Sequence, residues 1–170
     1  KPAGCVSATE DNLHRTVMDY LTDTARHDLF PVGRLDIDTE GLLLITNDGA
    51  LAHDLLSPTK HVSKVYYAEI DGLVTEEDVN LFKNGVDIGE GKPTKPALLE
   101  ILHQGDNSKI RLTITEGKFH QVKRMFEAVG KKVTYLKRVE MGTLVLPDDL
   151  APGEYRPLTE PELQRLRNVR

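Results

Sequence analysis

The sequence predicts an α+β domain, built on a mainly antiparallel or mixed central sheet that a few helices flank. Several segments are rich in β-branched and aromatic residues, which favour strands. One of these segments alternates apolar and polar residues with a period of two, whereas the segments with helical spacing are short. Strands combined with short helices around an antiparallel or mixed sheet are typical of α+β folds.

Five segments are expected to form strands. The clearest is 109–115, where Ile110, Leu112 and Ile114 alternate with polar residues. The run 42–46 is expected to be a buried strand, because it is apolar without interruption up to its last residue. The other strands are expected at 62–70, 97–102 and 133–141.

Helices are expected where apolar residues recur with helical spacing and capping residues precede them. Asp48, Thr75 and Thr159 are the expected N-caps, and Gly130 is expected to close the helix before it. The expected helices span 14–21, 50–56, 75–83, 119–129 and 159–166.

Composition and charge limit the classes of function. The net charge of −5 argues mildly against a nucleic-acid partner when it is taken alone. No apolar run approaches the ~20 residues of a membrane span, so no membrane contact is expected. The single cysteine, Cys5, excludes an internal disulfide, and a reducing cytoplasm is therefore the expected location.

Positive charge is concentrated in residues 109–138, which we call the basic stretch. It contains nine basic residues and two acids, which gives a net charge of +7. Because a polyanion responds to the local field rather than to the total charge, this stretch is a candidate surface for nucleic acid. A solvated basic face without a partner is the alternative.

Three carboxylates alternate directly before the apolar run: Asp36, Asp38 and Glu40. A calcium-binding loop begins in the same way, but the twelfth position counted from Asp36 is Asn47, where such a loop needs a bidentate glutamate. The calcium interpretation therefore fails. Turn chemistry alone makes all three acids a solvated part of a strand-capping loop, so a role for Asp36 needs a further argument.

The strand expected at 62–70 carries two neighbouring tyrosines, Tyr66 and Tyr67. Side chains alternate along a strand, so one tyrosine joins the core and the other can line a cleft and stack on a planar ligand. The helix expected at 119–129 carries the neighbouring cations Lys123 and Arg124. They point about 100° apart, so one can face inward and pair with a carboxylate, and two solvent-exposed cations are the alternative.

These segments, in this order and spacing, resemble the pseudouridine synthases of the RsuA/RluA superfamily. The family's aspartate motif, Gly-Arg-Leu-Asp-x-x-Thr-x-Gly-Leu, is matched at 33–42. The strand motif Lys-x-Tyr and the helix motif His-Gln-x-basic are matched by Lys64, Tyr66, His120, Gln121 and Lys123. Gly33 and the sequence at 120–125 are similar to the RsuA branch, and within it to the enzyme acting on 16S ribosomal RNA.

The resemblance implies an isomerase that converts uridine to pseudouridine with Asp36 as its catalytic carboxylate. Tyr66 is implied to stack on the flipped-out uracil, and Lys123 to be the cation that keeps the carboxylate ionised. Many members have arginine at the position of Lys123. A lysine there would contact Asp36 as a point charge, whereas arginine would form a bidentate pair. The residues implied to contact RNA are Arg34, Lys64, Lys118, His120, Gln121 and Arg124. No metal, nucleotide cofactor or redox group is implied.

The implied partner is ribosomal RNA, either small-subunit RNA or an assembling subunit, modified by a monomeric enzyme. Residues 1–170 are expected to be the catalytic domain, without the RNA-binding module and the first catalytic-domain residues that precede it in relatives. Three alternatives remain open: an RNA-binding module without catalysis, a synthase acting on 23S ribosomal RNA, and a metal-dependent hydrolase using Asp36, Asp38 and Glu40.

Overall fold

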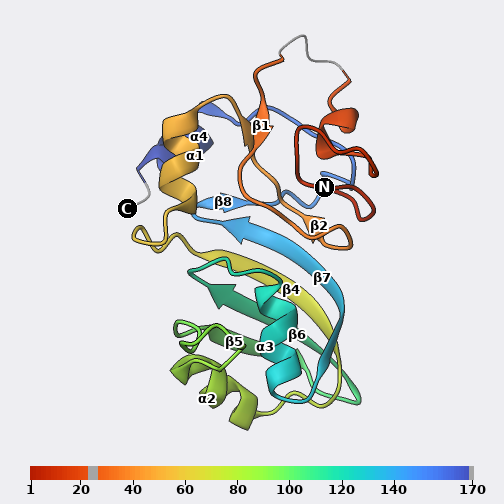
Figure 1. The fold of residues 1–170 in the computed structure, drawn as a ribbon, viewed down its shortest axis with the longest axis vertical. Helices are drawn as coiled ribbons and strands as arrows, with labels where there is room; N and C mark the ends of the chain where they lie inside the picture. Colours follow the sequence, from red (N-terminus) through yellow and green to blue (C-terminus); the bar gives the residue numbers. More distant parts are fainter. Residues whose placement is uncertain (23–26, 169–170) are drawn as a thin grey trace. The chain divides into compact units, whose positions relative to one another are not determined.

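The computed structural model describes residues 1–22 and 27–168, and it divides the chain into two compact units. Unit 1 comprises Lys1–Val62 and Val139–Arg170, and unit 2 comprises Ser63–Arg138 (Figure 1). Unit 2 is therefore one continuous segment between the two parts of unit 1. The described residues include no helix with both the length and the apolar character that crossing a membrane requires.

Unit 2 is built on four neighbouring strands in the order β7-β4-β6-β5. Both β4 and β5 pair with β6 in antiparallel register. The strands span Lys64–Asp71 (β4), Leu98–His103 (β5), Asn107–Ile114 (β6) and Lys132–Met141 (β7), and β7 continues into unit 1.

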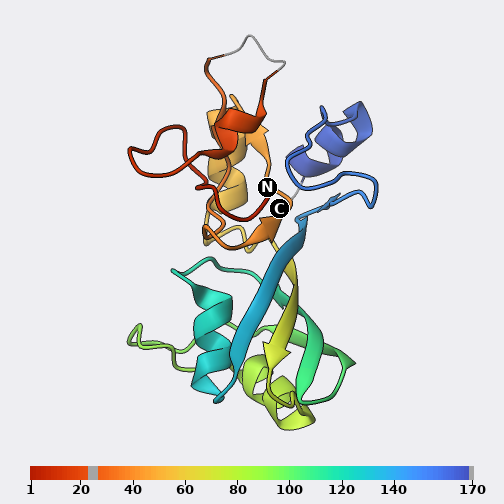
Figure 2. The ribbon, with the colours of Figure 1, turned by 90° about the vertical axis from the view of Figure 1, so that its right-hand side faces the viewer.

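The two faces of this sheet differ in burial. The register places Tyr66 opposite Leu112 and Ala68 opposite Ile110, and all four side chains are buried. The helix α3 (Gln121–Ala128) lies on one side of the strands in Figure 2, and α2 (Glu76–Asn84) contacts β5. Phe82 of α2 and Phe126 of α3 are fully buried and complete the core of unit 2. Their rings meet edge to face with centroids 5.0 Å apart.

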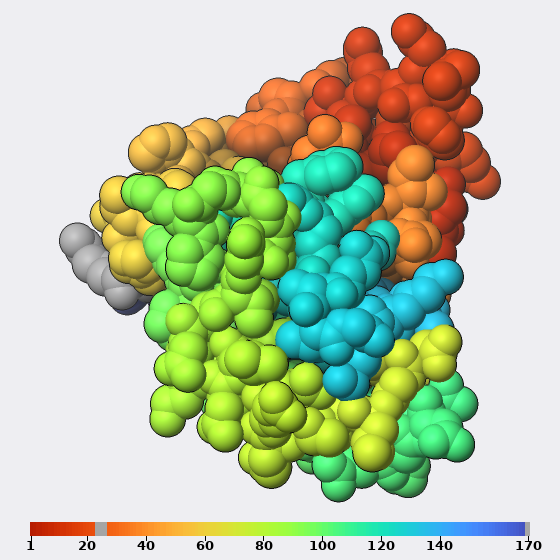
Figure 3. Space-filling view, turned by 60° about the horizontal axis from the view of Figure 1, so that its bottom comes forward, coloured from red at the N-terminus to blue at the C-terminus, as the bar shows by residue number. Residues whose placement is uncertain are grey.

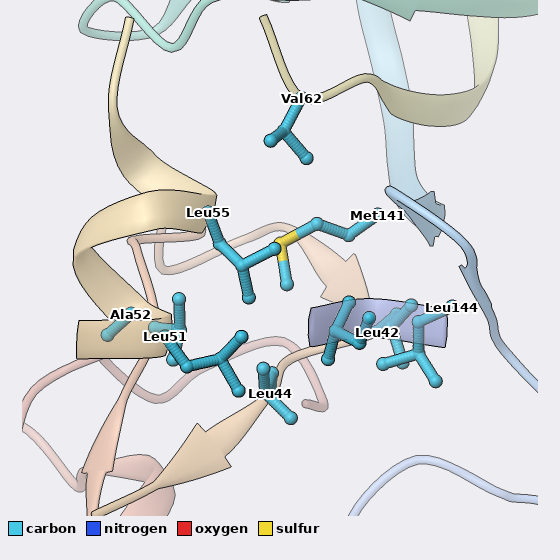
Figure 4. Packing of buried hydrophobic residues seen from close by; sticks show 10 residues of the cluster. Leu42, Leu44, Leu51, Ala52, Leu55, Val62, Met141 and Leu144 are labelled. Carbon is cyan, nitrogen blue, oxygen red and sulfur yellow. The ribbon is translucent and has the colours of Figure 1, made fainter. Parts of the chain in front are cut away.

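Unit 1 contains short strands and two α-helices around a core of its own. Its elements are the 3₁₀ helix η1 (Val17–Tyr20), β1 (Phe30–Pro31), β2 (Glu40–Gly41), β3 (Ile45–Thr46), α1 (Gly49–Leu56), β8 (Leu144–Val145) and α4 (Glu160–Arg167). Strands β1 and β3 pair with each other, β8 pairs with the end of β7, and β2 is the neighbour of β7 in strand order. The core joins both parts of the unit, since Leu42, Leu55 and Met141 pack together in it (Figure 4).

The α+β prediction is confirmed, and so are the helices expected near 50–56, 75–83, 119–129 and 159–166. Asp48 accepts a hydrogen bond from the Leu51 backbone N–H, and capping boxes are present at Thr75 and Thr159. The helix predicted at 14–21 is a single four-residue 3₁₀ turn.

The prediction of a strand over 42–46 is wrong for most of its length. Only Ile45 and Thr46 pair with another strand, although Leu42 and Leu44 are buried in the core of unit 1. A run of apolar residues indicates that a segment is buried. A buried segment need not pair with a neighbouring strand. The two-residue strands β1, β2 and β8 were not predicted, because so short a segment has no visible period.

Replacing Gly85 by alanine is expected to destabilise the protein by about 3 kcal/mol or more. Gly85 ends α2 with φ +90° and ψ 145°, and a Cβ there would lie 2.2 Å from the Thr94 carbonyl oxygen. Urea unfolding measures the loss. The control is Gly91→Ala, where φ is also positive but no atom lies within 4 Å of the added Cβ. Equal losses in the two variants would contradict the steric explanation.

Candidate active site

Asp36 lies in a tight turn of unit 1. Its backbone carbonyl accepts a hydrogen bond from the Thr39 N–H at 3.0 Å, and its side chain is half-buried. Leu35 before it is buried, whereas Asp38 two residues later is exposed. Asp36 is therefore more enclosed than Asp38, whereas Glu40 is half-buried like Asp36.

The N-terminal segment fixes the backbone around Asp36 from both sides. The Ser7 hydroxyl accepts from the Leu35 N–H at 3.0 Å and donates to the Leu35 carbonyl at 3.2 Å. The Gly4 N–H donates to the Ile37 carbonyl at 2.8 Å. A side chain whose neighbours are held in this way loses little entropy when it acts, which suits a catalytic group.

The Lys1 ammonium adds a third anchor to the same turn. Its Nζ donates to the carbonyls of Ile37 at 3.1 Å and Thr39 at 2.7 Å. Burial lowers the pKa of Lys1, while nearby negative charges, including that of Asp36, act in the opposite direction. Nothing in the spacing of the sequence indicated that Lys1 and Ser7 hold the turn.

The strand β4 places Lys64 and Tyr66 on the same face of the unit 2 sheet, and both are buried at 8% exposure. Tyr67 points to the opposite face, where its hydroxyl donates to Glu69 Oε2 at 2.8 Å and its ring meets Tyr135 edge to face. The two tyrosines therefore differ as the alternation of a strand requires.

Buried charges of both signs lie near Lys64. Burial lowers the pKa of Lys64, the neighbouring Arg138 lowers it further, and Glu116 opposes both. Arg138 and Glu116 are themselves buried, and Glu116 accepts from the Lys95 N–H and lies 3.9 Å from Lys118 Nζ. Two cations and one carboxylate are therefore buried in this part of unit 2.

The turn at 118–121 leads into α3 and carries three of the residues predicted to bind RNA. The buried Gln121 side chain accepts from the Lys118 N–H at 3.0 Å. His120 adopts the left-handed conformation, with φ 49° and ψ 37°, which is uncommon outside glycine. Lys123 follows on the first turn of α3 and is half-buried.

Arg124 was expected to contact RNA, and its guanidinium has several partners within unit 2. Nη1 donates to Glu90 Oε1 at 2.7 Å and to the Phe119 carbonyl at 2.9 Å, and Nη2 donates to the Ile88 carbonyl. These bonds connect α3 to the loop after α2; Figure 3 shows the cyan surface of the first directly beside the green surface of the second. The pair also lowers the pKa of Glu90.

The basic stretch does not form one uniform patch. Lys131 pairs with Asp78 at 2.9 Å, and Arg124 pairs with Glu90. On the strands, the register sets Lys109 opposite Glu69, and Arg111 opposite Glu100. Acids outside the basic stretch therefore pair with two of its nine cations and lie opposite two more across the strands, and the net charge of +7 overstates the local field.

The predicted site residues divide between the two units. Arg34, which is exposed, and Asp36 lie in unit 1. The others lie in unit 2: Lys64, Tyr66, Lys118, His120, Gln121, Lys123 and Arg124. Within the described ranges 1–22 and 27–168, no group of three or more His, Cys, Asp or Glu side chains is arranged to hold a metal ion.

Comparison with known proteins places the chain in a family. The profile of the RNA pseudouridylate synthase family matches residues 1–128. The uncharacterized RNA pseudouridine synthase YtzG of Bacillus subtilis is 55% identical over 168 residues, which are 98% of this chain and 70% of that protein. Ribosomal small subunit pseudouridine synthase A of Escherichia coli is 46% identical over 164 residues, covering 96% and 70% respectively.

Solved structures agree with this result. A crystal structure of a pseudouridylate synthase superposes with a TM-score of 0.91 at 42% identity, over 98% of this chain and 70% of that one. A chain of an H/ACA ribonucleoprotein bound to a substrate RNA superposes with a TM-score of 0.61 at 19% identity, over 85% and 46%, which shows a common fold. Fold and sequence together define an isomerase that acts on RNA. The chain belongs to the RNA pseudouridylate synthase family.

Proposed function

We propose that this chain is the catalytic domain of a cytoplasmic, monomeric enzyme that converts one uridine of 16S ribosomal RNA to pseudouridine. The observation that carries the proposal is the family's aspartate motif at 33–42 in a turn whose backbone is anchored on both sides of Asp36. The relatives named ribosomal small subunit pseudouridine synthase A, 43–46% identical over nearly the whole chain, support the choice of RNA.

The reaction breaks the N-glycosidic bond of uridine, rotates the uracil, and joins its C5 to the ribose; C5 loses a proton and N1 gains one. Asp36 acts as the carboxylate that attacks the ribose or removes a proton from it. The base must leave the RNA stack, at a cost of a few kcal/mol, and the exposed Arg34 fills the vacated position. Tyr66 stacks on the uracil and assists removal of the C5 proton.

The test is incubation of the protein with transcripts of 16S and 23S ribosomal RNA and with small subunits under assembly. Pseudouridine is detected by its reaction with carbodiimide. We expect one modified uridine in 16S RNA. Pseudouridine found only in 23S RNA would show that the substrate is large-subunit RNA. RNA binding without pseudouridine would show that the protein is an RNA-binding module without catalysis. Cleavage of the RNA without pseudouridine, abolished by a chelator, would favour the metal-dependent hydrolase.

Replacing Lys123 by methionine is expected to lower the single-turnover rate of pseudouridine formation by about 10-fold or more. Methionine keeps the length of the side chain and removes its charge, so any stabilisation that the ammonium gives to the reacting groups is lost. Single-turnover rates at saturating protein measure the loss. The control is Lys132→Met, which removes an exposed cation of β7. An unchanged rate would remove Lys123 from the mechanism.

A further inference from the structure

Phe119 differs from the other phenylalanines of the chain. Phe82 and Phe126 are fully buried, and Phe30 packs against the core of unit 1, whereas Phe119 is 73% exposed. We propose that Phe119 and His120 form a stacking platform for an unpaired RNA base other than the reacting uridine. The proposal rests on the proposed function only in taking RNA as the ligand.

The two rings already stack on each other. Their centroids lie 3.7 Å apart and their planes differ by 19°, although the residues are neighbours in sequence. The left-handed backbone at His120 belongs to the same turn. One face of the Phe119 ring lies against the imidazole, and its high exposure leaves surface for another planar group. Successive bases of single-stranded nucleic acid stack on aromatic side chains in this manner.

Hydrogen bonds hold the platform in place before any ligand arrives. Arg124 Nη1 donates to the Phe119 carbonyl at 2.9 Å, and the Arg124 N–H donates to the His120 carbonyl at 3.0 Å. The Lys118 N–H donates to Gln121 Oε1 at 3.0 Å, and the Gln121 N–H donates to the Lys118 carbonyl at 3.1 Å, which closes the turn. Since the backbone of the turn is held at both ends, stacking of a base costs little further ordering of the backbone.

The surroundings favour a nucleobase over an aliphatic partner. An aliphatic group gains contact area from any exposed apolar side chain, whereas a base gains most from a flat pair of conjugated rings. Lys118, 30% exposed, precedes the platform and can reach the phosphate that accompanies a stacked base. Arg124 is a positioning residue here, because its guanidinium holds the backbone of the platform and the Glu90 loop.

A tryptophan in place of Phe119 tests the platform directly. The chain contains no tryptophan, so Phe119→Trp creates a single fluorescent reporter at the site. The probe is a single-stranded oligoadenylate of about eight nucleotides, which contains no uridine and cannot enter as the reacting base. We expect the oligoadenylate to quench the tryptophan, and an abasic strand of equal length and charge to leave its fluorescence nearly unchanged.

The matched control is Leu102→Trp, which places the reporter at another exposed apolar position of unit 2. Neither strand is expected to quench it. Equal quenching of Phe119→Trp by both strands would show that only phosphates bind there, and that result would overturn the platform. Absence of quenching by the oligoadenylate at every concentration tried would overturn it as well.

Kinetics provide a second readout on the native reaction. We expect Phe119→Ala to raise KM for the RNA about 5- to 100-fold with little change in kcat, and Phe119→Tyr to behave like the unsubstituted protein. The exposure of Phe119 makes a folding defect in these variants easy to exclude by thermal unfolding. An unchanged KM in Phe119→Ala would overturn the platform alone, whereas a wild-type protein that forms no pseudouridine would overturn the proposed function.

Discussion

Replacing Asp36 by asparagine is expected to lower the rate of pseudouridine formation by about 10⁴-fold or more. Asparagine has nearly the same shape, and the backbone bond from the Thr39 N–H to the carbonyl of residue 36 is retained. Its amide carries no negative charge, so it can neither attack the ribose nor remove a proton from it. Single-turnover release of tritium from C5-labelled uridine measures the rate.

Affinity for RNA is expected to remain nearly unchanged in Asp36→Asn, because phosphate and stacking contacts supply most of the binding. The matched controls are Asp38→Asn and Glu40→Gln, which remove the two alternating carboxylates that the motif does not single out. Both should keep most of the activity. If Asp38→Asn were as inactive as Asp36→Asn, the assignment of the catalytic group would have to be abandoned.

Replacing Tyr66 by phenylalanine is expected to slow release of the C5 proton by about 10²-fold or more. The phenyl ring preserves the stacking surface, so binding of RNA should change little, and only the proton transfer that needs the hydroxyl is lost. Comparing the rate of C5 proton release with the rate of glycosidic bond cleavage in one turnover separates the two steps.

Tyr67→Phe is the matched control for Tyr66→Phe. Tyr67 is the next residue of β4 and points to the opposite face of the sheet, where its hydroxyl bonds to Glu69. Loss of that bond should cost about 1 kcal/mol of stability and none of the rate. A Tyr66→Phe variant with unchanged proton release would reduce Tyr66 to a stacking role.

Features with a local physical cause could be predicted from the sequence. The period of two in β6 and the caps at Asp48, Thr75 and Thr159 follow from interactions within a few residues, and the structure contains them all. The aspartate motif also lies within ten residues, so it could be found in one sequence and assigned by resemblance.

Features that depend on distant residues could not be predicted. Lys1 and Ser7 hold the turn around Asp36 from about 30 residues away or more, and their spacing has no period that would show it. The positive charge of the basic stretch was overestimated for the same reason, because Asp78 and Glu90 precede that stretch in sequence and meet it only after folding.

The division of the chain has a consequence for how the protein is made. Because unit 2 is one continuous segment, all of its residues are synthesised before Val139. Unit 1 must wait, since its core joins Val32 and Leu42 with Met141, Leu144 and Leu166. We therefore expect the unit that carries Asp36 to be completed last during translation, after the chain has closed a loop of 76 residues between its two halves.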